Sequence, residues 1–159
     1  MSEVTYTQLG YHETPLRVQF GHIDGYGYLW HGHALSYFEI ARADLVRPFS
    51  LSAGALVEAG LAVPMLDVSI SYKNPAYDDE QLVVQSSLLK PSIALPELRF
   101  RYHVLRLDSG EEILRGWTKQ LLIHKDGGVL IRLPKPIRDG IDAIWNYLDN
   151  RPRWSDKSP

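Results

Sequence analysis

Residues 20–42 read FGHIDGYGYLWHGHALSYFEIAR, and this stretch decides most of the fold. Apolar and polar residues alternate over 16–20, which predicts a short strand leading into a glycine-rich turn. The turn carries one carboxylate, Asp24, and a long apolar helix follows from about His31. Negative charge is stabilised beside the unpaired N–H groups of a helix N-terminus. A carbonyl held between that acid and the helix could be attacked from one side and polarised from the other, so the stretch predicts an acyl-transfer site.

The helix is expected to run over about 31–47, because Pro48 ends it. Nine of the 13 residues from 34 to 46 are apolar, and a helix that is apolar on nearly all sides is a buried one. Glu39 and Arg42 lie on its narrow polar stripe, three residues apart, where they can form a structural ion pair.

Beyond the helix the apolar residues recur with a period of two. Four further strands are predicted over 66–72, 82–89, 98–104 and 113–124, separated by short turn sequences. Connections this short favour antiparallel neighbours. A short C-terminal helix is expected over 137–148 and a loose tail after 150. The chain is read as one domain over 1–159, with its core over about 14–137.

Composition excludes several classes of protein. The chain has 159 residues, 45% of them hydrophobic, with a formal net charge of −2 and a pI of about 6.3. No overall basic field favours nucleic acid or anionic lipid, and the absence of cysteine excludes a thiolate nucleophile or Cys-type zinc site. The N-terminal residues lack the features of a signal peptide, and no apolar run approaches a membrane span. A cytoplasmic protein without nucleic-acid or membrane partners is expected.

The chain carries two motifs at fixed spacings. The first is Asp24-x-x-Gly27-x-x-Trp30-His31 followed by Tyr37-Phe38-Glu39-x-Ala41-Arg42, and the second is Val68-x-Ile70-x-Tyr72-x-x-Pro75-Ala76-x-Asp78-Asp79. Together they resemble the hotdog-fold acyl-CoA thioesterases of the 4-hydroxybenzoyl-CoA thioesterase type. The resemblance implies an α+β hotdog fold, in which a curved antiparallel sheet of about five strands wraps around one long buried helix.

The resemblance also implies an activity, the hydrolysis of an acyl-CoA or acyl-carrier-protein thioester without cofactor or metal. Asp24 matches the catalytic aspartate, which acts as nucleophile or as base for a water. His31 matches the position whose backbone N–H polarises the thioester carbonyl. Lys90 stands where the family often carries a basic residue facing the nucleotide phosphates of coenzyme A, and Arg132 is a weaker candidate for the same contact.

Other residues near the turn are candidates for substrate contact. Tyr26 and Trp30 can line an acyl pocket, although aromatic residues at a helix entry are often simply part of the core. After the histidine the family usually has a small residue, an asparagine and an aromatic residue, whereas this chain has Gly32, His33 and Ala34. The loss of the aromatic residue enlarges or reshapes the acyl pocket, and His33 adds a titratable group beside the site.

Three alternatives to thioester hydrolysis stay open. Dehydratases of the same fold typically pair a histidine in the pocket with an acid at a different position, and His33 leaves that activity open. A hotdog domain could bind acyl-CoA without catalysis, although a binder has no need of a carboxylate facing a carbonyl. His31-x-His33 followed by Glu39 resembles a cupin metal motif, but the stretch is helical and its spacing departs from that motif. His22 lies two residues before Asp24, so on a strand both side chains would share a face, and His22 either hydrogen-bonds the acid or is exposed.

Assembly is predicted from the sheet. A single curved sheet of this size leaves one edge strand and an apolar flank exposed, and pairing with a second copy would cover both. A homodimer or homotetramer is therefore expected, as is usual in the family that the chain resembles.

Overall fold

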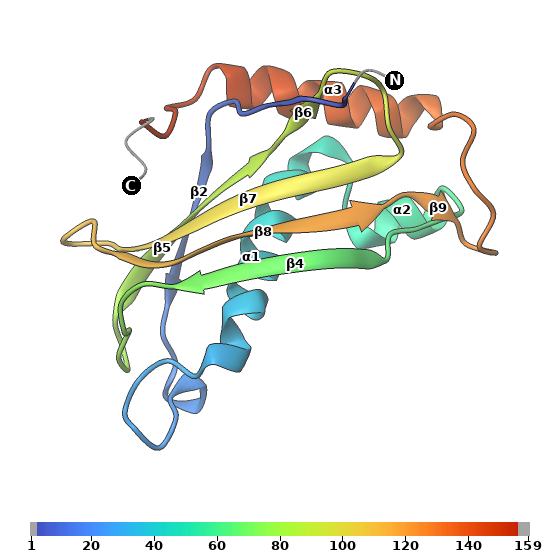
Figure 1. Cartoon of the computed structure of the whole chain (residues 1–159). Helices are drawn as coiled ribbons and strands as arrows, with labels where there is room; N and C mark the ends of the chain where they lie inside the picture. The colour runs from blue at the N-terminus through green and yellow to red at the C-terminus, as the bar shows by residue number, and fades with distance from the viewer. Residues whose placement is uncertain (1–2, 156–159) are drawn as a thin grey trace.

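A computed structural model describes residues 3–155 of the chain (Figure 1). Its strands are β1 (Tyr6–Thr7), β2 (His12–Arg17), β3 (Leu61–Ala62), β4 (Met65–Tyr72), β5 (Gln81–Leu88), β6 (Lys90–Pro91), β7 (Glu97–Arg106), β8 (Glu112–Leu121) and β9 (Ile123–His124). Its helices are α1 (Ala34–Val46), α2 (Ala53–Glu58) and α3 (Lys135–Asp149), with 3₁₀ turns η1 (Phe20–His22), η2 (His31–His33) and η3 (Arg47–Phe49). The two long helices lie where the sequence predicts them, whereas α2 was not predicted.

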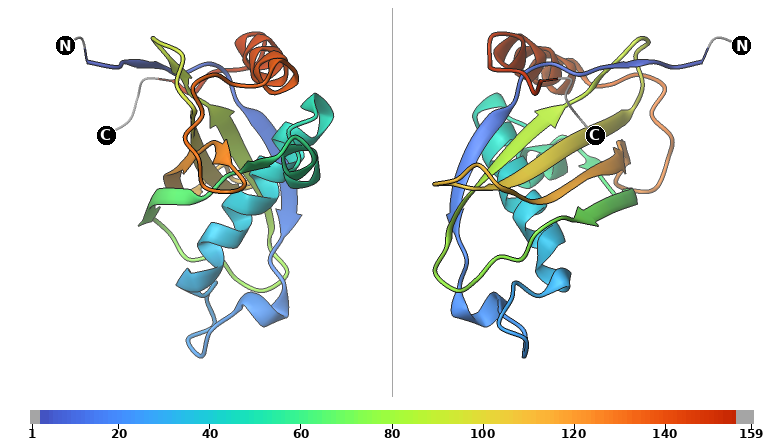
Figure 2. Two further views of the ribbon diagram at one scale, coloured as in Figure 1. Left: turned by 90° about the vertical axis from the view of Figure 1, so that its right-hand side faces the viewer. Right: turned by 60° about the vertical axis from the view of Figure 1, so that its left-hand side comes forward.

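The five longer strands form one antiparallel sheet in the order β2-β5-β7-β8-β4. The sheet curves, and α1 crosses its concave face, as the two views of Figure 2 show. This arrangement confirms the α+β hotdog architecture expected from the sequence. The glycine-rich turn that precedes α1 projects beyond one end of the sheet (Figure 1).

Close contact between α1 and the sheet depends on ring stacking and on one glycine. The rings of Phe38 and Tyr102 are fully buried and stack with their centroids 4.4 Å apart. At Gly116 of β8, a Cβ atom would lie 2.7 Å from the Phe38 ring and 2.2 Å from the carbonyl oxygen of Ser69. The absence of a side chain at 116 therefore lets the helix approach the sheet this closely.

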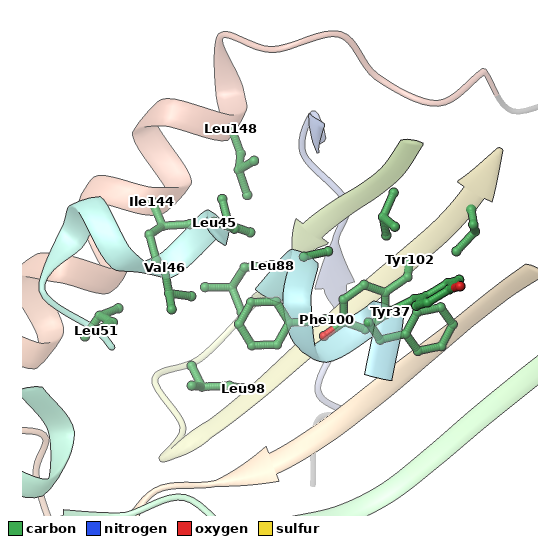
Figure 3. Close-up of a cluster of buried hydrophobic side chains, with 14 of the residues drawn as sticks. Tyr37, Leu45, Val46, Leu51, Leu88, Leu98, Phe100, Tyr102, Ile144 and Leu148 are labelled. Carbon is green, nitrogen blue, oxygen red and sulfur yellow. The ribbon is translucent and has the colours of Figure 1, made fainter. Parts of the chain in front are cut away.

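Helix α3 covers one end of this core. Figure 3 shows Ile144 and Leu148 of α3 pointing toward Leu45 and Val46 of α1, with Leu88 of β5 beside them. All five side chains belong to one hydrophobic cluster of buried residues. The C-terminal helix is therefore part of the core of this domain.

The segment after α3 differs from the loose tail expected after residue 150. The indole N–H of Trp154 donates to Gln85 Oε1 at 2.7 Å, and its ring lies 4.5 Å from that of His103, centroid to centroid. Trp154 thus lies against the face of the sheet opposite α1, because the indole finds both an aromatic ring and a hydrogen-bond acceptor there. Residues 156–159 lie outside the described residues.

The predicted strand over 16–20 is wrong at both ends, because β2 begins at His12 and ends at Arg17. Phe20 lies in η1 with 81% of its surface exposed. The N–H of His22 donates to the carbonyl oxygen of Gln19 at 2.8 Å, which closes a tight turn in place of an extended segment. Three alternating apolar residues do not distinguish a strand that continues from one that turns.

Strand β4 is an edge of the sheet and is poorly covered by α1. Ile70 pairs with Gly116, which faces α1, so Val68 and Tyr72 lie on the same side of the sheet. Val68 is 39% exposed and Tyr72 is 53% exposed. One flank of the helix layer is therefore open next to an unpaired strand edge.

Candidate functional site

A tight turn over residues 23–29 holds Asp24. The N–H of Asp24 donates to the carbonyl oxygen of Tyr28 at 2.8 Å. The N–H of Gly27 donates to the carbonyl oxygen of Asp24 at 3.0 Å. Gly27 has a φ of +85°, a conformation that side chains with a Cβ rarely adopt. The glycine in the motif is therefore required by the backbone of the turn.

The turn also orients the carboxylate of Asp24. Its Oδ1 accepts hydrogen bonds from the backbone N–H groups of Tyr26 at 2.8 Å and Tyr28 at 3.3 Å. Its Oδ2 has no hydrogen-bond partner among residues 3–155, and the side chain is half-buried. One carboxylate oxygen is thus fixed by the backbone, while the other is available to attack a carbon or to accept a proton from water.

The entry to α1 lies next to this turn. The N–H of Trp30 donates to the carbonyl oxygen of His22 at 2.8 Å, which ties the start of η2 to the residue two before Asp24. The hydroxyl of Tyr72 donates to the carbonyl oxygen of His31 at 2.9 Å. Within the part of the chain that the structure describes, the N–H groups of His31 and Gly32 donate to no acceptor. Free N–H groups at a helix entry can stabilise the negative oxygen that forms when a carbonyl is attacked.

The helix begins differently from the prediction. Residues 31–33 form the 3₁₀ turn η2, and α1 itself starts at Ala34 rather than at His31. The imidazole of His31 is exposed and lies beside the indole of Trp30, with a centroid distance of 5.1 Å. The free donor at this position is in the main chain, as the resemblance implies.

The predicted substrate-binding residues fall into two groups. Tyr26, Trp30 and His33 lie in or next to the turn that holds Asp24, where Tyr26 and Trp30 are exposed and His33 contacts the Trp30 ring. Lys90 lies in β6, toward the opposite end of the molecule (Figure 1), with its ammonium 5.4 Å from the centroid of the Trp145 ring.

Arg132 lines a cavity of about 460 Å³ between residues 91–97 and α3. One chain alone therefore does not bring Lys90 and Arg132 together with Asp24.

A larger cavity, of about 550 Å³, lies under the C-terminal half of α1. Helices α2 and α3 and strands β7 and β8 complete its largely apolar wall. Glu39 and Arg42 also line it, and they form the predicted ion pair. Asp24 precedes the other end of α1, which at about 1.5 Å per residue is roughly 20 Å long. Within one chain the carboxylate and this cavity are therefore separated.

His22 does not contact Asp24, in contrast to one of the alternatives predicted. Because η1 is a 3₁₀ turn and not a strand, the two side chains do not share a sheet face. The imidazole Nδ1 of His22 lies 3.0 Å from the hydroxyl of Tyr37 on α1. The spacing of the sequence carried no signal for this contact, because it depends on how the turn folds back on the helix.

Between residues 3 and 155 no group of three or more His, Asp or Glu side chains is placed to hold a metal ion. In the same part of the chain, no helix combines the length and the apolar character that crossing a bilayer demands.

Comparison with known proteins shows what part of the chain resembles. Residues 26–90 match the model of the thioesterase superfamily. A Bacillus subtilis protein that carries the provisional name acyl-CoA thioesterase YneP is 27% identical over 124 residues, which cover 78% of this chain and 88% of the relative.

Two solved structures share the fold. A 1,4-dihydroxy-2-naphthoyl-CoA thioesterase from Synechocystis superposes with a TM-score of 0.75 at 20% identity, covering 84% of this chain and 96% of that one. A Staphylococcus aureus protein solved in complex with CoA superposes with a TM-score of 0.78 at 12% identity, covering 94% and 92%. The family match supports thioester hydrolysis as the activity. These matches confirm the resemblance to the hotdog-fold thioesterases, with residues 26–90 as the part that matches the thioesterase superfamily model.

Proposed function

We propose that the chain hydrolyses acyl-CoA thioesters with Asp24 as the catalytic carboxylate. One observation carries the proposal: a carboxylate with one free oxygen lies in a turn tied to a helix entry where two N–H groups are unpaired. The relative from Bacillus subtilis supports acyl-CoA as the substrate class. The S. aureus protein with the same fold, which was solved in complex with CoA, is compatible with that choice.

The proposed chemistry follows from these groups. Asp24 Oδ2 attacks the thioester carbonyl carbon, the C–S bond breaks, and coenzyme A leaves as thiolate; water then hydrolyses the acyl-aspartate anhydride to the free acid. In the other form, Asp24 removes a proton from the water that attacks. In both forms the N–H groups of His31 and Gly32 donate to the developing oxyanion, and one such donor is commonly worth about 3–4 kcal/mol of barrier.

We infer that the acyl group occupies the 550 Å³ cavity of a second copy of the chain. Tyr72, at the C-terminal end of β4, contacts His31 at the helix entry. Met65, at the other end of β4, pairs with Gln120, which lines the cavity. Antiparallel pairing of two β4 edges sets the Tyr72 end of one chain beside the Met65 end of the other. Asp24 of one chain then approaches the cavity of its partner, and a dimer holds two equivalent sites.

The basic residues fit this arrangement. Leu98 pairs with Gln120, so the residues before β7 lie at the end of the sheet where the large cavity is. Arg132 lines the smaller cavity that these residues border. Lys90 and Arg132 are therefore proposed to contact the phosphates of a coenzyme A whose acyl group enters the neighbouring large cavity. A pairing of dimers into a tetramer stays a prediction.

The proposed activity is tested with a panel of benzoyl, short aliphatic and long aliphatic CoA thioesters. Release of free thiol is measured with a thiol reagent, and binding of the same compounds is measured by calorimetry. We expect catalytic thiol release from at least one member. Binding without release would favour the alternative of a non-catalytic acyl-CoA-binding domain.

The two-chain site predicts the effect of a charge on the edge strand. In Val68→Arg, pairing of two β4 edges would bury two unpaired guanidinium groups, which is strongly unfavourable. We expect a monomer by light scattering, a retained circular dichroism spectrum, and a loss of kcat/KM on the order of 10²-fold, because the reacting groups are no longer held together.

Leu107→Arg is the matched control for this variant, because Leu107 is 51% exposed in the turn after β7 and its N–H donates to Gln81 of β5, on the side of the sheet away from β4. It is expected to retain both assembly and activity. A monomeric Val68→Arg protein with parental activity would show that the site is complete within one chain.

A further inference from the structure

His22 connects the three segments that form the proposed site. Its Nδ1 lies 3.0 Å from the hydroxyl of Tyr37 on α1. The same nitrogen accepts a hydrogen bond from the backbone N–H of Gln19 at 3.4 Å. Its carbonyl oxygen accepts the N–H of Trp30, at the start of η2. One residue thus joins the end of the β2 segment, the helix α1 and the entry where His31 offers its N–H.

The hydrogen bonds define the form of the imidazole. The Gln19 N–H can only donate, so Nδ1 of His22 acts as an acceptor. Tyr37 is fully buried, and burial raises its pKa to about 12, so its hydroxyl keeps its proton and can donate to the same nitrogen. The ring is therefore neutral, with its proton on Nε2.

A second imidazole disfavours protonation of this ring. The rings of His22 and His33 lie 4.5 Å apart, centroid to centroid. Burial, and then the charge that His33 can carry, lower the pKa of His22 below its ordinary value of 6.5. No carboxylate of residues 3–155 forms an ion pair or hydrogen bond with His22 that would offset this effect. The nearest acid along the chain, Asp24, has its Oδ1 bound to backbone N–H groups of its own turn.

We propose that neutral His22 is a positioning residue, which holds the turn of Asp24 against the helix entry and releases it when the imidazole is protonated. The inference rests on the proposed function of Asp24. Protonation turns Nδ1 into a donor, so the Gln19 N–H faces another N–H, and the Tyr37 hydroxyl must turn its own proton away. The charged ring is also repelled by His33 when that ring is protonated.

The direction of the pH effect follows from the lowered pKa. An unfolded or released turn binds this proton near pH 6.5, whereas the docked turn binds it only at lower pH. Docking is therefore fully stable above pH 6.5 and weakens as the pH falls below that value. Activity is expected to decrease over the same range.

The decrease in kcat below pH 6.5 forms the acid limb of the profile of kcat against pH. Two substitutions should shift this limb in opposite directions. In His22→Asn, the amide oxygen takes the place of Nδ1 as acceptor but cannot be protonated, so the limb should move to lower pH. At pH 5 the variant is expected to exceed the parent by at least about threefold relative to their activities at pH 7.5. In His33→Asn, the second charge is absent, so the pKa of His22 rises and the limb should move to higher pH.

His124→Asn is the matched control, because His124 is exposed in β9, which pairs with β3 and not with the turn of Asp24, and its profile should equal that of the parent. The same proteins are followed by NMR titration of the imidazoles and by hydrogen exchange of the amides of residues 23–31 against pH. These two measurements do not require activity, so they test His22 even if the parent hydrolyses no thioester.

An unchanged acid limb and unchanged exchange in His22→Asn would overturn the proposal. If that variant does not fold, His33→Asn decides, because a limb that stays in place or moves to lower pH also overturns it.

Discussion

Asp24→Asn is expected to lower kcat on the order of 10³-fold or more, which is about 4 kcal/mol of barrier. The amide keeps an oxygen that can accept the backbone N–H groups of Tyr26 and Tyr28, so the turn stays folded. It lacks the charge and the basicity that attack on a thioester, or activation of a water, requires. KM is therefore expected to change little. The measurement is steady-state thiol release from the best substrate of the acyl-CoA panel.

A matched control exists elsewhere in the chain. Asp126 lies in an exposed turn, and its Oδ1 accepts a hydrogen bond from the backbone N–H of Gly128. This residue stands two positions further on, as Tyr26 does relative to Asp24. Asp126→Asn is expected to have parental activity. His31→Ala should stay within about tenfold of the parent, because its proposed contribution comes from the main chain. If Asp24→Asn were nearly as active as the parent while His31→Ala were inactive, an imidazole mechanism would replace the one proposed.

Phe38→Ala is expected to cause the largest loss of stability, about 3–5 kcal/mol in the free energy of unfolding. The Phe38 ring is fully buried and stacks on Tyr102, and its removal leaves a void between α1 and β8. For a chain of this size the midpoint of thermal unfolding should fall by roughly 10 °C. Chemical denaturation measures the loss, with both proteins at one concentration so that any assembly affects them equally.

Phe20→Ala is the corresponding surface substitution. Phe20 is 81% exposed, so its removal should change the unfolding free energy by less than about 0.5 kcal/mol. Equal losses for Phe20→Ala and Phe38→Ala would mean that α1 does not pack on the sheet as described.

The sequence predicts the fold well where the pattern of apolar residues is long. The run over 34–46 predicted the buried helix, and the alternating runs after it predicted β4, β5, β7 and β8 to within a few residues. The errors lie in short segments. Residues 20–22 and 31–33 form 3₁₀ turns, whose single-turn hydrogen bonds leave no periodic pattern in the side chains. Helix α2, at 53–58, is too short to show a period.

The residues of the candidate site were likewise predicted where they are close in the chain and missed where they are far apart. Asp24 and His31 are close in the chain, so their motif predicted the turn and the helix entry together. Lys90 lies far away in sequence, and its distance from Asp24 depends on the curvature of the sheet, which no local pattern contains. The hydrogen bond between His22 and Tyr37 was missed because it crosses from a turn to a helix.

The exposed edge of β4 also constrains how the sequence can vary. Proteins that stay monomeric protect such an edge with lysine or proline, since an open edge with apolar side chains invites aggregation. In the proposed two-chain site the same protection would separate Asp24 from the cavity that it serves. Natural variants should therefore keep an open, apolar β4 and restrict aggregation by fast and tight self-association, so that selection for solubility and selection for catalysis act on the same eight residues.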